Sequence, residues 1–160
     1  MLNPWLNDNW KKYYNNTTIR GGVYLRFEVN VNNDVKCALK KFMKWIRNNY
    51  AFPIRLPIYV KCSEYVRTRD GDLVVGSFFE PNDYFVEPYI RMSTGDYIHL
   101  LKSYGRDDAL ASIIYTLSHE ITHYYQWINR LNLTISEREK QADYYGDYIL
   151  HLYANYVDSP

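Results

Sequence analysis

Two histidines four positions apart, His119 and His123, constrain the fold of this chain more than any other feature of its sequence. Four residues at 3.6 per turn overshoot one full turn by about 40°, so both imidazoles lie on one helical face and can close on a single ion. Glu120 follows the first histidine and would lie beside that ion, where a carboxylate can take a proton from water. The segment that carries the three residues is therefore expected to be a helix facing a cleft.

The residues around this motif repeat with a helical period. Polar side chains recur on the face that carries the histidines, at Ser112, Thr116, His119, His123, Gln126 and Arg130. Apolar side chains recur on the opposite face, at Leu110, Ile114, Leu117, Ile121, Tyr124 and Ile128. This pattern predicts a helix that packs on a core through one face and opens the other to a cleft. The alternative is an ordinary amphipathic helix with two surface histidines.

A third ligand is needed, because a catalytic zinc ion keeps three protein ligands and one open position. The run 136–150 offers Glu139 and, four residues later on the same helical face, Asp143. We expect Glu139 to reach the ion and Asp143 to accept an N–H from His119, since ligand histidines usually bond a carboxylate through their second nitrogen. Gly146 lies one turn further on. A helical glycine costs stability, so it predicts a close approach of the two helices at the metal.

Glu139 also fits a second interpretation, as a helix cap. Ser136 and Glu139 have the spacing of a capping box, in which a hydroxyl and a carboxylate satisfy the first backbone N–H groups of a helix. Thr134 and Glu137 have the same spacing, so capping does not require Glu139. The ligand role is therefore favoured.

The motif His119-Glu120-Ile121-Thr122-His123, followed by Glu139-x-x-Ala142-Asp143, resembles the gluzincin clan of zinc metallopeptidases. In that clan a glutamate from a second helix completes the metal site, and an aspartate four residues on supports the first histidine. The fifteen residues between His123 and Glu139 make the chain similar to the small members, the minigluzincins and the ImmA/IrrE-like and SprT-like domains of bacteria and phages. The resemblance covers roughly residues 84–156.

The resemblance implies an α+β, zincin-like fold, in which a small mixed sheet packs on the active-site HExxH helix and a C-terminal glutamate helix. The length of 160 residues predicts one domain, 1–160, with a sheet-bearing upper part at about 20–105 and the two site helices at about 107–156. Residue patterns predict the other elements: strands at 23–31, 58–66, 73–80 and 86–93, and helices at 34–49 and within 3–16.

Pro88 lies inside the last predicted strand. Proline cannot donate to a strand ladder, so this position indicates the edge of a sheet. Zincins hold an extended substrate against an edge strand that precedes the active-site helix, so the resemblance makes Tyr89 to Ser93 the candidate for that strand. The alternative is an ordinary sheet edge without a substrate.

Composition narrows the function classes only slightly. The net charge is +1, and no apolar run approaches 18 residues. With no charged-then-apolar leader either, we expect a soluble, cytoplasmic monomer that does not contact a membrane. Cys37 and Cys62 have no metal-binding spacing and are expected to be reduced thiols. The 18 tyrosines and many asparagines are typical of an AT-rich coding sequence, as in a low-GC bacterium or its phage.

A basic line is the one feature that points toward nucleic acid. It is formed by Lys36, Lys40, Lys44 and Arg47 on the predicted helix 34–49. A solvated helix face is the simpler interpretation, and a weak nucleic-acid contact is the alternative.

The function predicted from these residues is that of a Zn²⁺-dependent endopeptidase acting on a protein or peptide substrate. His119, His123 and Glu139 would hold the ion, and Glu120 would take the proton of the attacking water and pass it to the leaving amine. The candidates for a donor to the developing oxyanion are Tyr115, Tyr124, Tyr144, Tyr148, His99 and His151.

Two other functions compete with this one. A non-catalytic zinc-containing protein- or DNA-binding module would gain nothing from a carboxylate beside the metal, which disfavours it. A DNA-associated, SprT-like protease would make use of the basic line, and salt-dependent DNA binding would favour it.

Overall fold

The computed structural model describes residues 2–14 and 20–159 of the chain. Its elements are α1 Lys11–Tyr14, β1 Val23–Phe27, α2 Asn33–Asn49, β2 Leu56–Lys61, β3 Val66–Arg67, β4 Leu73–Val74, β5 Gly76–Phe79, β6 Tyr89–Ser93, α3 Tyr97–Tyr104, α4 Arg106–Ile128 and α5 Ile135–Val157. The mixed α+β class is as predicted. The helix expected within 3–16 is confined to α1, and its expected end at 15–16 lies outside the described residues.

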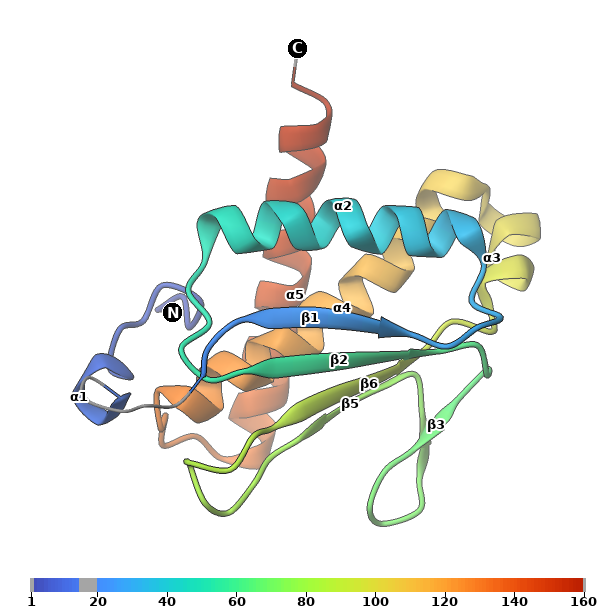
Figure 1. The fold of residues 1–160 in the computed structure, drawn as a ribbon. Coiled ribbons are helices and arrows are strands. Elements are labelled where there is room, and N and C mark those ends of the chain that lie inside the picture. The colour runs from blue at the N-terminus through green and yellow to red at the C-terminus, as the bar shows by residue number, and fades with distance from the viewer. Residues whose placement is uncertain (1, 15–19, 160) are drawn as a thin grey trace.

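A four-stranded mixed sheet, in the order β1-β2-β6-β5, forms one layer of the fold (Figure 1). The β1–β2 and β2–β6 pairs are parallel, whereas β5 runs antiparallel to β6. The short strands β3 and β4 form a separate antiparallel hairpin just before β5. The outer strand β5 contacts the motif helix α4, and it is the one strand of these four that runs antiparallel to its neighbour.

The prediction that Tyr89 to Ser93 forms the sheet edge is wrong. These residues form β6, which pairs with β2 on one side and with β5 on the other. Pro88 lies directly before the first residue of β6, where its missing N–H removes no ladder bond. The proline therefore marks the start of an inner strand, and the edge belongs to Gly76–Phe79.

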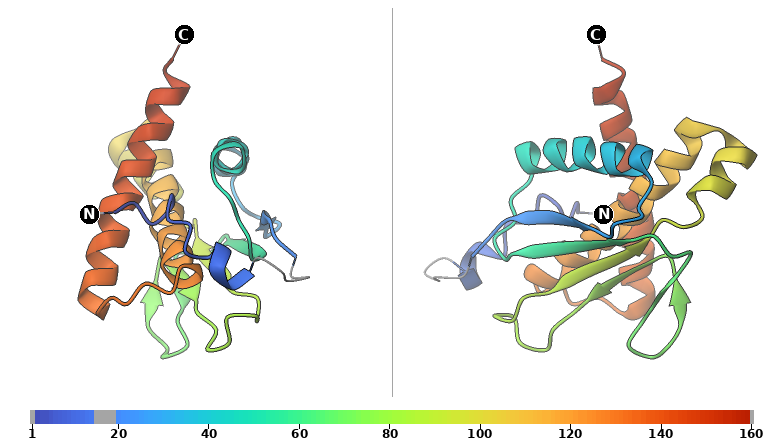
Figure 2. Two further views of the ribbon diagram at one scale, coloured as in Figure 1. Left: turned by 90° about the vertical axis from the view of Figure 1, so that its left-hand side faces the viewer. Right: turned by 45° about the vertical axis from the view of Figure 1, so that its right-hand side comes forward.

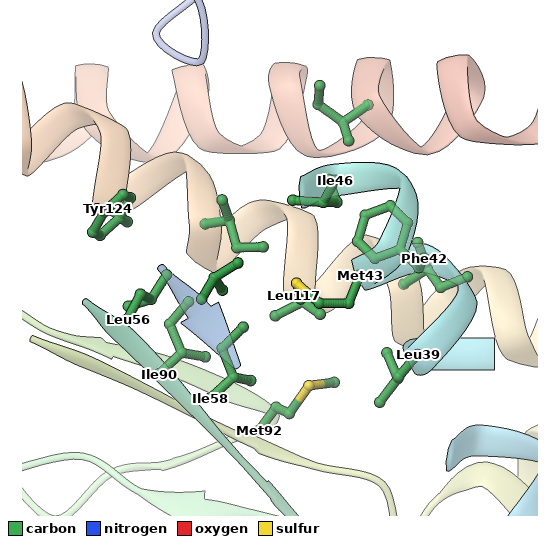
Figure 3. Close-up of a cluster of buried hydrophobic side chains, with 14 of the residues drawn as sticks. Leu39, Phe42, Met43, Ile46, Leu56, Ile58, Ile90, Met92, Leu117 and Tyr124 are labelled. Carbon is green, nitrogen blue, oxygen red and sulfur yellow. The ribbon is translucent and has the colours of Figure 1, made fainter. Parts of the chain in front are cut away.

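Helices α2 and α4 cover one face of the sheet, and α5 packs along α4 (Figure 1, Figure 2). The core between them is built from fully buried side chains of the sheet, α2 and α4 (Figure 3): Leu56, Ile58, Ile90 and Met92; Leu39, Phe42, Met43 and Ile46; Leu117 and Tyr124. Burying a large apolar side chain stabilises the fold by about 1.5–3 kcal/mol. This core fixes α4, and with it the histidine motif, against the sheet.

The N-cap of α5 is Thr134, the first residue of the second of the two spacings. The Thr134 hydroxyl oxygen accepts from the Glu137 backbone N–H at 3.1 Å, and its O–H donates to the Glu137 carboxylate at 3.0 Å. These contacts cap α5 and leave the side chain of Glu139 available for another role.

The remaining predictions about the surface have mixed outcomes. Cys37 and Cys62 are free thiols, as expected. Arg47 of the basic line donates twice to the Val23 carbonyl, at 2.8 and 3.0 Å, so its side chain ties α2 to β1. The nucleic-acid contact through Lys36 and its neighbours stays a prediction. Within the described ranges, no helix has both the length and the apolar character needed to cross a membrane.

Candidate metal centre

Helices α4 and α5 bring the three predicted metal ligands together. His119 and His123 lie one turn apart on α4, and Glu139 lies in the second turn of α5. One ligand atom from each residue lies within 4.8 Å of the others. Oε2 of Glu139 lies 3.3 Å from Nε2 of His119, and Oε1 of Glu139 lies 3.1 Å from Nε2 of His123. A single carboxylate thus faces both imidazoles.

The two separations between Glu139 and the histidines are near those found around a small tetrahedral ion. Ligand atoms held about 2.0–2.2 Å from a tetrahedral zinc lie roughly 3.3–3.6 Å from one another. The 3.3 and 3.1 Å distances from Glu139 to the histidines are close to this range, so an ion could be accepted with little movement. Two imidazoles and one carboxylate suit zinc and also other first-row divalent metals.

Gln126 determines which nitrogen of His123 faces the site. Its amide nitrogen donates to the Arg138 carbonyl at 3.0 Å and to the Gln141 side-chain oxygen at 2.9 Å, which uses both of its hydrogens. Its oxygen is left to accept from Nδ1 of His123, at 2.8 Å. In the neutral ring the proton is therefore on Nδ1, and Nε2 presents a lone pair to Glu139.

Asp143 has the corresponding role for His119. Its Oδ1 lies 3.1 Å from Nδ1 of His119 and accepts a hydrogen bond of 3.2 Å from the Tyr115 hydroxyl. Burial, and next the charge of Asp143, raise the pKa of Tyr115 to about 12, so this hydroxyl stays protonated as a donor. The Nε2 atom of His119 is thereby directed at Glu139, and Asp143 lies where the sequence predicts it.

Glu120 is buried at the base of the same site. Its side chain is 9% exposed, and its Oε1 lies 3.9 Å from Nε2 of His119. Loss of hydration, with a smaller contribution from the charge of Glu139, raises the pKa of Glu120 to about 8. Glu120, His119, His123 and Glu139 all line one cavity of about 400 Å³. The cavity therefore combines a proton acceptor with the three candidate ligands.

The edge strand β5 forms the opposite wall of this cavity, through Gly76, Ser77 and Phe78. A Cβ atom at Gly76 would lie 2.9 Å from Cγ2 of Thr116, closer than real Cβ atoms come, and 3.1 Å from Cγ of Glu120, a tight contact. The missing side chain thus allows the strand to run directly against α4. The backbone of β5 borders the carboxylate of Glu120 as a result.

The close helix approach predicted from Gly146 is confirmed. A Cβ atom at this position would lie 3.2 Å from both the Cα and the backbone nitrogen of His119. Because α5 approaches α4 at this point, Glu139, about two turns earlier, can reach both histidines.

None of the six candidate oxyanion donors lines this cavity, and the hydroxyl of Tyr115 is directed at Asp143 instead. Tyr124 is fully buried in the core and donates to the Ile54 carbonyl at 2.5 Å. Tyr144 and Tyr148 are exposed on α5, where their rings stack on each other. His99 is exposed, and His151 bonds the Asp147 carbonyl of its own helix at 2.8 Å.

Three contributors to the site were not assigned roles from the sequence: Gln126, Gly76 and Arg138. Gln126 already belonged to the polar face of the motif helix, three residues after His123, and this spacing was the available signal. Arg138 lines the cavity and pairs with Glu80 at 2.9 Å. Arg138 directly precedes the predicted ligand Glu139 in the sequence, and this position was the available signal.

Comparisons of the chain with protein-family models, with curated proteins and with solved structures give no match. The function is therefore argued from the geometry and chemistry of this centre.

Proposed function

We propose that this protein is a zinc-dependent endopeptidase of the gluzincin type with a zincin-like fold. The observation that carries the proposal is the convergence of His119, His123 and Glu139 beside the buried carboxylate of Glu120. A metal site with a purely structural role has no need of a second, buried acid beside its three ligands, and burying that acid destabilises the fold. This combination favours catalysis over passive metal binding.

The hydrogen-bond network supports a bound cation at this site. Nδ1 of His119 faces Asp143 and Nδ1 of His123 faces Gln126, so each neutral ring directs the lone pair of Nε2 at Glu139. Acceptors 3.1–3.3 Å apart repel unless a cation lies between them or the rings take a second proton. Burial is the main cause that lowers the pKa of His123, which disfavours its protonated form. A divalent metal would relieve this repulsion.

Zinc held by His119, His123 and Glu139 would supply Lewis acidity for a scissile carbonyl and for a water molecule in the cavity. Glu120 takes the proton of that water as it attacks the carbonyl carbon, and then passes the proton to the leaving nitrogen. Asp143 and Gln126 hold the two imidazoles in the orientation that the site requires. No covalent bond forms between protein and substrate, and the products are two shorter peptides.

The substrate would lie along the free edge of β5, in place of the strand assigned from the sequence. This edge borders the cavity through Gly76 to Phe78, opposite the ligand residues. An extended peptide can add to a free strand edge through backbone hydrogen bonds, which position it without regard to sequence. The scissile bond would then lie between the strand and Glu120.

Metal content and peptide cleavage, measured on the same preparations, test this proposal. The parent should hold about one zinc per chain and cleave a mixed peptide library, whereas His123→Ala should lose both properties. Glu120→Gln should keep the zinc and lose at least about 100-fold in rate. Glu64→Gln, at an exposed position, is the matched control and should behave as the parent does.

Two results would contradict the assignment. Full, tightly held zinc in His123→Ala would show that the ligand set is different. A zinc-loaded parent that cleaves none of the library would favour the non-catalytic binding module instead.

A further inference from the structure

A second cavity, of about 430 Å³, opens beside the same edge strand. Ser77 and Phe78 of β5 line both this cavity and the one at the metal centre. Three arginines line the second cavity: Arg67, Arg69 and Arg91. Whatever lies along β5 at the metal centre therefore also reaches this arginine pocket.

The strand register places the pocket on the sheet face that points away from α4. Ser77 pairs directly with Arg91 across β5 and β6, so their side chains share one face. Phe78 points to the other face, where its ring lies 6.4 Å from that of Tyr124 in the core. Because Ser77 is small, it leaves open the space between Arg91 and the free edge of β5.

The guanidinium groups of the pocket contact backbone carbonyls and an aromatic ring. The Arg91 guanidinium donates to the Arg67 carbonyl at 3.0 Å, and that of Arg67 donates to the Gly71 carbonyl at 3.1 Å. The Arg69 guanidinium lies 5.0 Å from the centre of the Phe79 ring.

None of the three arginines forms an ion pair with a carboxylate in the part of the chain that the structure describes. The carboxylate of Glu80, in the pocket wall, is engaged by Arg138 at 2.9 Å. Several N–H donors of the three guanidinium groups therefore remain available to a ligand.

We propose that the arginine pocket binds an acidic side chain of the peptide substrate, carried by the residue that lies opposite Ser77. This proposal rests on the peptidase function proposed above. Side chains of an added strand alternate between its two faces, so every second substrate residue points away from the metal centre and toward the arginines.

The reach of the side chains agrees with this assignment. A strand added to β5 would lie two strand spacings, roughly 10 Å, from β6. A glutamate and Arg91 can meet over Ser77 across that distance, and an arginine binds a carboxylate through two parallel hydrogen bonds. The enzyme is therefore expected to select peptides with glutamate or aspartate at one fixed position near the cleaved bond.

Two quenched fluorescent peptide libraries test the proposal. Both vary the residues around the cleaved bond; one includes glutamate among the varied residues, and the other has glutamine in its place. The zinc-loaded parent should cleave the glutamate library about fivefold faster, with the acid concentrated at one position, and added salt should reduce the difference. Arg69→Gln and Arg91→Gln should bring the ratio of the two rates close to one. Lys102→Gln, at an exposed position on α3, serves as the charge-matched control and should keep the parent ratio.

The outcomes separate this proposal from the peptidase assignment. Equal cleavage of both libraries by the parent would overturn the acidic preference and leave the peptidase function standing. Cleavage of neither library would count against the peptidase function itself.

In that second case, anisotropy measurements of library binding to zinc-loaded Glu120→Gln decide about the pocket. Stronger binding of the glutamate library that Arg69→Gln abolishes would support an acidic ligand, and equal binding would overturn it. A single-stranded DNA oligonucleotide that binds more tightly than either library, and more weakly to Arg69→Gln, would overturn the assignment to a peptide.

Discussion

Replacing Glu120 by glutamine should stabilise the metal-free protein, although it should slow the proposed cleavage at least about 100-fold. The carboxyl is buried, and its pKa is raised from an ordinary value of 4.5 to about 8. At about 1.4 kcal/mol per pH unit, this difference corresponds to roughly 3–5 kcal/mol of folding free energy at alkaline pH. Glutamine has nearly the same shape and cannot ionise, so it avoids this cost.

The direction in which the stability difference changes with pH follows from whether the folded or the unfolded protein holds the Glu120 proton more tightly. Below about pH 4.5 the carboxyl of Glu120 is protonated in both the folded and the unfolded protein, and the substitution should change stability little. Between pH 4.5 and about 8 the unfolded chain loses this proton first, so the parent becomes less stable as the pH rises. Above pH 8 the full cost is present. The advantage of Glu120→Gln should therefore grow from pH 5 to pH 9.

Urea unfolding in the presence of EDTA, followed by circular dichroism at pH 5, 7 and 9, measures this effect. Glu64→Gln removes the same charge at an exposed position and controls for the change in net charge. Zinc should narrow the gap between Glu120→Gln and the parent, because a nearby cation favours the ionised carboxylate. A stability difference that is the same at pH 5 and pH 9 would refute the reasoning.

Three further predictions concern the metal centre. Gln126→Leu removes the acceptor for Nδ1 of His123 and should weaken zinc binding about 10–100-fold in a competition titration with a chromophoric chelator; unchanged affinity would show that another group orients the ring. Gly146→Val places a branched side chain against the His119 backbone and should cost about 1–3 kcal/mol, visible in thermal melts; a rise in melting temperature would contradict the close approach. Zinc at 100 times its dissociation constant should stabilise the parent by about 2.7 kcal/mol and leave His123→Ala unaffected.

The residue placements that the sequence predicted correctly depend on distances within a single helix. His119 and His123 face the same way because of helical periodicity, and so do Glu139 and Asp143. Only the meeting of the two pairs required information across the chain. Gly146 supplied that information, because a glycine in the middle of a helix indicates where another backbone comes close.

The position of the sheet edge could not be predicted in this way. Whether a strand lies at the edge is decided by its partners, and β6 finds them at residues 56–61 and 76–79. Pro88 carries only the local information that one backbone donor is missing. The role of Gln126 was hidden for a similar reason. Its two acceptors, Arg138 and Gln141, lie on the other helix of the site.

Two absent side chains set the width of the proposed active groove from opposite sides. Gly76 lets β5 approach Glu120, and Gly146 lets α5 approach His119. The histidine motif by itself requires only a periodic helix, whereas the third ligand and the substrate edge each require a second backbone close to that helix. Enlarging residue 146 should therefore weaken metal binding first, whereas enlarging residue 76 should displace the strand edge and slow cleavage while the metal stays bound. If enlarging residue 146 slowed cleavage while the metal stayed bound, and enlarging residue 76 weakened metal binding, the two glycines would have other roles.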